Sequence, residues 1–312
     1  MAVSVAAPLV TSLEEFALTA RAAEAAPASA APVKPMPSGK IGKVQISRLI
    51  CGGNLISGYA HSRDLIYVSN LLKAYFTEEK IMETWDVCYQ NGINTMIFAP
   101  SDKRALEIYR KYHARNGKMQ CIAQVTPDKD NLDPAIREAA DAGVTGMVLV
   151  GNYGDEWTRT GDVDRIGKFV EKAKAQNVIV GVCGHELRTP MTVEKAGINP
   201  DFYMKTLHST SYWSKRRPDQ MKEVIDNYGV DNYWCMDPEG TIQFMAGIER
   251  PWIAYKVLAA GAIPPKAGFQ YAFENGADFC VVGMFDFQVA ENATIATEIV
   301  KATQNRDRAW MA

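Results

Sequence analysis

Gly146-Met-Val-Leu-Val150 and Val178-Ile-Val-Gly-Val-Cys183 are two short apolar runs, separated by a charged stretch in which apolar residues recur every three or four positions between residues 164 and 176. Short apolar runs rich in β-branched residues predict buried strands, and the intervening periodicity predicts a helix. A strand, a helix and a second strand form the unit that builds parallel sheets. This stretch therefore predicts an α/β fold.

The same alternation extends in both directions along the chain. Eight candidate strands are expected at 47–51, 95–98, 120–125, 146–150, 178–183, 202–205, 252–257 and 279–282. Helices are expected between them at 79–91, 133–142, 164–176, 219–227 and 266–274. Eight such units fit a (β/α)8 TIM barrel, which usually needs about 250 residues. A doubly wound open sheet is the alternative, although no GxGxxG motif follows a strand.

The first 38 residues differ from the rest and are assigned to a leader, with one barrel domain over residues 39–312. The apolar start at 1–10 and the small-residue run at 20–31 are typical of an export signal, but the positively charged start of such a signal is missing. We therefore expect the remnant of a longer signal, read from an upstream start, and a periplasmic protein. A flexible leader on a cytoplasmic enzyme is the alternative.

Composition restricts the classes of partner. The 312 residues carry 34 Lys+Arg against 36 Asp+Glu, so no basic excess indicates nucleic acid or an anionic membrane surface. No apolar run reaches the roughly 20 residues that span a bilayer. The six cysteines form no Cys-x-x-Cys pair and are expected to be buried thiols. A small-molecule substrate is the expected partner, and the oligomeric state is left open.

In a TIM barrel, the side chains that follow the strands face the active site. Three of the four histidines fall in such positions: His61 after the first strand, His185 after the fifth and His208 after the sixth. Substrate contacts are expected from polar and aromatic residues in the same loops, namely Asn54, Arg63, Asn152, Arg188, Tyr212 and Trp213.

Several motifs are similar to those of a known family. Gly92-Ile-Asn-Thr-Met-Ile-Phe-Ala-Pro100 resembles the GINFFDTA strand of aldo-keto reductases, and Val180-Gly-Val-Cys-Gly-His185 resembles their IGVSNH strand. The closing stretch 251–292, with Val281-Val-Gly-Met284 inside it, is similar to the end of bacterial members. The resemblance covers most of residues 45–295 and implies an aldo-keto reductase-like barrel.

The family's catalytic residues do not carry over. Aldo-keto reductases use Asp, Tyr, Lys and His to reduce a carbonyl with a nicotinamide cofactor. Here Ile97 stands in the place of the Asp, no Tyr follows in 99–104, and the strands expected to supply Lys and His read 122–125 and 148–152 without them. The segment that would hold the NADP phosphate reads Phe285-Asp-Phe-Gln288. The scaffold is therefore expected to perform another reaction.

Two kinds of chemistry could replace reduction. His185, His208 and His61 are candidate ligands of a divalent metal such as Zn, Mn or Fe. Lys205 and Lys256, with Glu186 as a carboxylate, are candidate catalytic residues, since a lysine in an apolar strand is costly to bury unless it serves a site. Structural or substrate-contacting roles for these side chains are the alternative.

We therefore expect metal- or lysine-assisted lyase or isomerase chemistry on a small sugar-like or keto-sugar substrate. An NAD(P)-dependent oxidoreductase is the first alternative, and a ligand-binding barrel without catalytic activity is the second.

Overall fold

The computed structural model describes residues 34–312, apart from 60, 62–64, 66, 129 and 216–234. Residues 1–33 of the expected leader lie outside the described residues. So do the helix expected at 219–227 and the substrate contact expected from Arg63.

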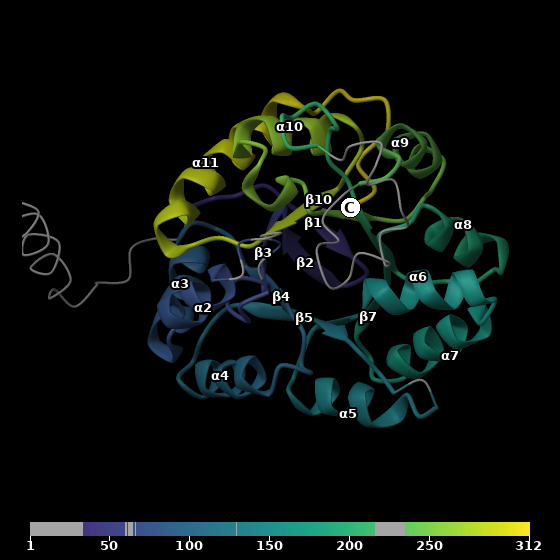
Figure 1. Ribbon diagram of the computed structural model, residues 1–312, viewed down its shortest axis with the longest axis horizontal. Coiled ribbons are helices and arrows are strands. Elements are labelled where there is room, and N and C mark those ends of the chain that lie inside the picture. Colours follow the sequence, from purple (N-terminus) through teal and green to yellow (C-terminus); the bar gives the residue numbers. More distant parts are fainter. Residues whose placement is uncertain (1–33, 60, 62–64, 66, 129, 216–234) are drawn as a thin grey trace, which may run out of the picture. The chain divides into compact units, whose positions relative to one another are not determined.

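Eight parallel strands close into a barrel in the order β10-β3-β4-β5-β6-β7-β8-β9 (Figure 1). Their bounds are β3 Leu49–Gly52, β4 Thr95–Phe98, β5 Gln120–Val125, β6 Gly146–Leu149, β7 Ile179–Gly184, β8 Phe202–Thr206, β9 Trp252–Tyr255 and β10 Phe279–Val282. The last strand pairs with the first, with Cys280 opposite Leu49, so the sheet has no edge. The predicted (β/α)8 TIM barrel is confirmed, and the open sheet is wrong.

Helices surround the barrel (Figure 1). They are α2 Val68–Tyr75, α3 Glu78–Gln90, α4 Lys103–Ala114, α5 Asp133–Asp141, α6 Gly151–Thr160, α7 Val163–Lys174, α8 Arg188–Lys195, α9 Pro238–Ala246, the short 3-10 turn η3 Ala259–Gly261, α10 Pro265–Glu274 and α11 Asp286–Ala302. Helix α9 begins at Asp237, whose carboxylate accepts a hydrogen bond from the Gly240 N–H. In the described part of the chain, no helix is long and apolar enough to cross a membrane.

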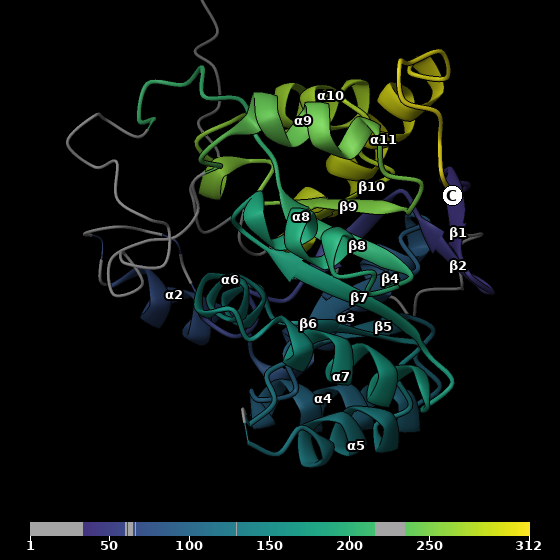
Figure 2. The same ribbon diagram turned by 90° about the vertical axis from the view of Figure 1, so that its right-hand side faces the viewer.

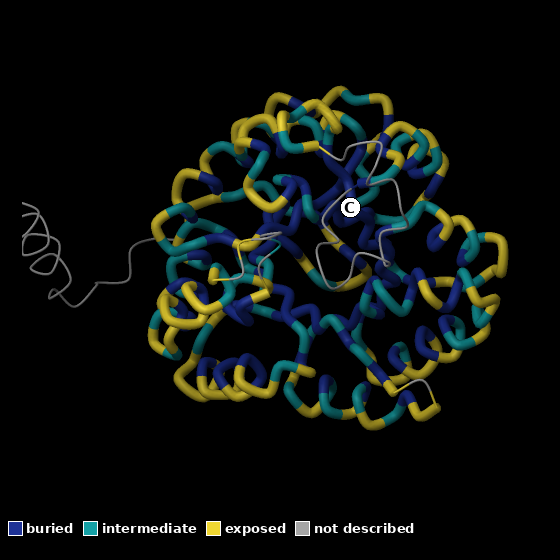
Figure 3. The backbone as a smooth tube through the Cα atoms, viewed as in Figure 1, coloured by how far each residue is buried: buried dark blue, intermediate teal, exposed yellow. Residues whose placement is uncertain are grey.

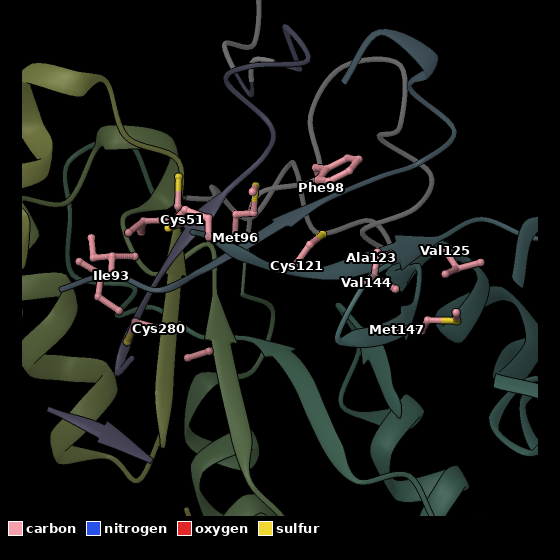
Figure 4. Close-up of a cluster of buried hydrophobic side chains, with 14 of the residues drawn as sticks. Cys51, Ile93, Met96, Phe98, Cys121, Ala123, Val125, Val144, Met147 and Cys280 are labelled. Atoms are coloured by element: carbon pink, nitrogen blue, oxygen red, sulfur yellow. The ribbon is translucent and has the colours of Figure 1, made fainter. Parts of the chain in front are cut away.

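The apolar side chains form two layers separated by the barrel wall. The inner layer takes side chains from every strand, including Ile50, Ile97, Ile122, Val148, Ile179, Phe202, Met204, Ile253, Tyr255 and Phe279. The outer layer lies between strands and helices, and part of it is shown in Figure 4. Figure 3 shows the corresponding pattern, with a buried barrel and exposure on the outer sides of the helices. Successive residues of a strand therefore point alternately into the barrel and toward the helices.

A two-stranded hairpin that the sequence did not predict precedes the barrel. Strands β1 (Ser38–Ile41) and β2 (Val44–Ser47) pair in antiparallel fashion and lie at one end of the barrel (Figure 2). Their Ile41 and Ile46 are fully buried against the inner layer. Because β2 leads directly into β3, the hairpin covers the amino-terminal end of the strands. Function is therefore expected at the opposite end.

A buried charged cluster joins the last residues to this closed end. The fully buried carboxylate of Asp278 accepts hydrogen bonds from Arg306 at 3.0 Å, Arg308 at 2.8 Å and the Trp252 N–H at 2.9 Å. Each arginine also donates to backbone carbonyls, so the buried charges are paired and hydrogen-bonded. The six cysteines are all free and buried, as predicted.

Candidate active site

The carboxyl ends of β7, β8 and β9 bring together an unusual set of polar side chains. His185 follows β7, His208 follows β8, and Tyr255 and Lys256 stand at the end of β9. Asp155 reaches the same place from α6. The tyrosine ring lies close to two of these groups: its centroid is 5.4 Å from the His185 ring and 5.7 Å from the Lys256 Nζ.

Asp155 fixes His185. One carboxylate oxygen accepts from His185 Nδ1 at 2.7 Å and from the His185 N–H at 2.9 Å. The other accepts from the Glu186 N–H at 3.0 Å and the Thr189 hydroxyl at 2.7 Å. A carboxylate that accepts all four bonds requires a proton on His185 Nδ1, which leaves Nε2 as the proton acceptor.

Burial lowers the pKa of His185 below its ordinary value. Asp155 acts in the opposite direction and raises it, whereas the charges of Lys256 and Lys205 lower it further. The imidazole is therefore neutral at pH 7. An uncharged, carboxylate-oriented histidine is the usual form of a general base.

The local sequence makes room for this histidine. Helix α6 begins with Gly151, and a Cβ there would lie 2.9 Å from His185 Cε1 and 3.1 Å from the Cys183 Sγ. Gly154, one turn on, approaches the Cys183 carbonyl so closely that a Cβ would lie 2.1 Å from it. The two glycines let α6 bring Asp155 up to the end of β7.

Lys256 adopts an unusual backbone conformation. Its φ is +60°, a left-handed value that residues other than Gly and Asn rarely adopt. The Lys256 Nζ lies 2.9 Å from His61 Nε2, and the Asn54 side-chain amide lies 3.3 Å from the same nitrogen. The loop after β3 therefore meets the end of β9 through the predicted residues Asn54 and His61.

His208 has both ring nitrogens in hydrogen bonds to the backbone. Its Nδ1 lies 3.0 Å from the Lys256 carbonyl oxygen, and its Nε2 accepts from the Cys235 N–H at 3.0 Å. The carbonyl needs a donor and the amide needs an acceptor, so the ring is neutral with its proton on Nδ1. Burial first, and then the charges of Lys205 and Lys256, lower the pKa of His208 to about 4, although the bond to Lys256 acts in the opposite direction.

The three predicted imidazoles thus lie near Lys256, and their contacts bear on the predicted metal site. His208 offers no ring nitrogen to a metal while both bond to the backbone. Across residues 34–312, leaving aside the undescribed positions, no group of three or more His, Cys, Asp or Glu side chains is placed to hold a metal ion. Uptake of a divalent metal by His185, His208 and His61 stays a prediction.

Lys205 does not face the barrel interior. In β8, Phe202 and Met204 belong to the inner layer, whereas Tyr203 and Leu207 belong to the outer layer, so the alternation places Lys205 on the outer side. The side chain is buried, and its Nζ donates to the Thr206 carbonyl at 3.0 Å. No carboxylate of the described residues lies within ion-pair distance of it. The expectation that Lys205 lines the mouth needs correction, although its charge still influences His185 and His208.

The other predicted site residues differ in their burial and in their contacts. Glu186 is half-buried beside Arg159, with 3.7 Å between the carboxylate and Nε. Asn152 lies half-buried in the first turn of α6, while Arg188 is exposed at the start of α8. Tyr212 has its ring 5.9 Å from that of His208, and Trp213 is 93% exposed.

Two residues of this cluster were absent from the sequence-based set. Tyr255 lies inside the strand expected at 252–257, and Thr206 is the first residue after the strand expected at 202–205. Both side chains are buried, and within the described residues neither hydroxyl makes a hydrogen bond of ordinary geometry.

Two cavities of about 470 and 460 Å³ open beside the ends of β4 and β5, and both are lined by Ser101 and Lys103.

Solved structures share this architecture. Two candidate aldo-keto reductases from Pseudomonas aeruginosa superpose on this chain with a TM-score of 0.58 each. The first is 15% identical in sequence, and the match covers 87% of this chain and 99% of the reductase. The second is 14% identical, and the match covers 86% of this chain and 98% of the reductase. The fold is that of an aldo-keto reductase-like (β/α)8 barrel. A phospho-2-dehydro-3-deoxyheptonate aldolase (DAHP synthase) from Thermotoga maritima follows with a TM-score of 0.52 and 10% identity, over 87% of this chain and 75% of its own. No protein-family model and no curated protein matches the sequence.

The positions that the motif resemblance assigns to reductase catalysis carry other residues in this barrel. Ile97, which stands in place of the reductase Asp, is an apolar member of the inner layer. Asp286, in the segment that would hold the NADP phosphate, receives hydrogen bonds from Tyr75 and Lys80. A carboxylate at this position repels a phosphate unless its charge is compensated. The polar cluster instead lies at the ends of β7 to β9.

Proposed function

We propose that this protein is a barrel enzyme of the lyase or isomerase class that removes a proton from the carbon beside a carbonyl group of a small sugar-like substrate. The observation that carries the proposal is the Asp155–His185 pair, with the Tyr255 ring close to both the His185 ring and the Lys256 amine. A base and a nearby cation are the two groups that this reaction requires.

His185 is the proposed base. Asp155 holds its ring and tautomer, and Nε2 accepts the proton from carbon. As His185 becomes an imidazolium, the Asp155 carboxylate stabilises the new positive charge. The pKa of His185 is lowered by burial, so the base is uncharged and ready at neutral pH.

Lys256 is the proposed cation. Loss of a carbon-bound proton places negative charge on the carbonyl oxygen, and a fixed ammonium beside that oxygen stabilises the enediolate. In this role Lys256 does the work that a metal ion would do as a Lewis acid. Its strained backbone is consistent with a positioned functional group.

A sugar-like substrate is favoured by the density of polar groups at the mouth and by the loop after β8. This loop carries Tyr212 half-buried and Trp213 exposed, and aromatic faces suit the apolar side of a sugar ring. The solved barrel that is described as a heptonate aldolase acts on a sugar acid, which is in keeping with this class.

The proposal is tested by hydrogen exchange from solvent. The full chain is incubated in D2O with dihydroxyacetone, D-fructose, D-xylose and D-galacturonate, and loss of carbon-bound protons is followed by NMR. We expect exchange in at least one of them, loss of it in His185→Gln, and no change in His113→Gln, a matched control on the exposed side of α4. Absence of exchange in all four refutes the proposal.

Cofactor and compartment remain predictions. Metal analysis of the purified protein tests for Zn, Mn or Fe, and a fluorescence titration with NADPH tests the oxidoreductase alternative. Processing of residues 1–38 during secretion tests export to the periplasm.

A further inference from the structure

Two buried hydroxyl groups inside the barrel make no hydrogen bond of ordinary geometry within the described residues. Thr206 and Tyr255 stand opposite each other in the register of β8 and β9. The Thr206 side chain is completely buried and Tyr255 is 7% exposed. Neither hydroxyl oxygen makes a hydrogen bond of ordinary geometry with the described residues, although the Tyr255 hydroxyl interacts with Thr206 and the Cys183 thiol outside that geometry.

A buried hydroxyl without a partner is costly, and a valine and a phenylalanine would fill the same space without that cost. Such a pair is therefore expected where a partner arrives from outside. The Tyr255 ring belongs to the inner layer, so its hydroxyl lies inside the barrel wall rather than among the helices.

The pair stands within the proposed active site. The Tyr255 ring lies 5.4 Å from the His185 ring and 5.7 Å from the Lys256 Nζ. Burial, and then the neighbouring Cys183 and Asp155, raise the pKa of Tyr255 well above its ordinary value, although the interaction with the Thr206 side chain lowers it. The hydroxyl therefore keeps its proton at neutral pH and can donate it.

We infer that the Tyr255 and Thr206 hydroxyls form the binding point for the carbonyl oxygen of the substrate, and that Tyr255 is the residue that protonates this oxygen. The inference rests on the proposed function and names the acid that complements the His185 base.

Each proton that moves in the proposed reaction has a donor and an acceptor. His185 Nε2 takes the proton from carbon, the C–H electron pair forms a C=C bond, and the carbonyl electron pair moves to oxygen. That oxygen takes the proton of Tyr255, giving an enediol and a tyrosinate beside the Lys256 ammonium. In isomerisation, the imidazolium returns its proton to the former carbonyl carbon, and the tyrosinate takes the hydroxyl proton of the neighbouring oxygen. No oxidant or co-reactant is needed.

Tyr255→Phe and Thr206→Val are the test variants, and Tyr109→Phe is the control because Tyr109 is equally buried but belongs to the outer layer. Two readouts are used: the D2O exchange rate, and calorimetric binding of glycolohydroxamate, an enediolate analogue. We expect Tyr255→Phe to slow exchange about 100-fold and to weaken binding about 10-fold, with smaller losses in Thr206→Val. Tyr109→Phe should change neither.

The thermal midpoint separates a catalytic role from a structural one. Because Tyr255→Phe removes an unpaired buried hydroxyl, we expect no loss of thermal stability. If this variant unfolds earlier but exchanges and binds at wild-type rates, the hydroxyls hold only structural water, and the inference is overturned.

The failures of the two proposals can also be told apart. Loss of exchange in His185→Gln with no effect of Tyr255→Phe overturns only the inference. A wild-type chain that exchanges no probe, but whose glycolohydroxamate binding depends on Tyr255, refutes the reaction and supports the oxygen-binding site. Neither exchange nor binding in the wild type overturns both.

Discussion

Acidification should destabilise the barrel through His208. The neutral ring donates from Nδ1 to the Lys256 carbonyl and accepts at Nε2 from the Cys235 N–H. Protonation would place an N–H at Nε2 facing the N–H of Cys235, so the cation cannot keep both bonds. Burial, and then the charges of Lys205 and Lys256, lower the pKa of His208 to about 4 in the folded chain, against an ordinary value of 6.5, although the bond to the Lys256 carbonyl raises it.

The lowered pKa fixes the sign and the pH window. The unfolded chain binds the proton first, so the contribution of His208 is complete above pH 6.5 and is lost as the pH falls toward 4. Each pKa unit corresponds to about 1.4 kcal/mol, which gives on the order of 3 kcal/mol over the whole window.

Urea unfolding of the wild type and of His208→Gln between pH 7.5 and 4.5 measures this contribution. Glutamine can donate and accept but does not titrate, so the other acid-sensitive groups cancel in the comparison. We expect the difference in unfolding free energy between the two proteins to shrink by about 2–3 kcal/mol as the pH falls. A difference that stays constant would refute the assignment of a neutral, doubly bonded imidazole.

Three further predictions concern the same end of the barrel. Gly151→Ala should displace His185, because the added Cβ lies 2.9 Å from the His185 ring, and D2O exchange should become about 10-fold slower or more. In the control Gly167→Ala the added Cβ meets only ordinary contacts at 3.6 Å, so exchange should be unchanged. Equal rates would contradict the proposed role of His185. Asp155→Asn leaves at least one buried donor unpaired, so urea unfolding should show a loss of about 2–4 kcal/mol; an unchanged stability would show that the four bonds are not made. Lys256→Gly relieves the left-handed strain and should be about 1 kcal/mol more stable than Lys256→Met, while both abolish exchange. A less stable glycine variant would argue against strain.

Most of the barrel could be predicted from the sequence because its strands are buried on both faces. The runs at 95–98, 120–125 and 279–282 are mostly apolar segments between helical stretches, and they match β4, β5 and β10 residue for residue. The hairpin β1–β2 escaped prediction because each strand has only four residues, among them exposed polar ones such as Lys40 and Gln45. Nothing in so short a pattern distinguishes it from a polar turn.

The site was predictable only as far as the ends of strands could be located. His185, His208 and His61 follow strands, and the structure does bring them together around Lys256. The sequence could not show that the backbone would use both nitrogens of His208, since the Cys235 amide comes from 27 residues further along the chain. Asp155 follows the strand β6 in the sequence, but its role depends on the glycines that let α6 approach β7.

The two lysines show how far strand alternation can be trusted. Lys205 lies inside a regular strand, where successive side chains alternate between the two faces. Since Phe202 and Met204 point into the barrel, Lys205 points toward the outer layer. The same alternation, counted from Tyr255 in the inner layer, would send Lys256 outward as well. Strand β9, however, ends at Tyr255, and the left-handed φ of Lys256 breaks the alternation, so that the Nζ reaches His61 across the mouth. A buried lysine in an apolar strand is therefore weak evidence for a catalytic amine, whereas a lysine held in a strained conformation just beyond the strand is stronger evidence, because the fold bears a cost to keep it there.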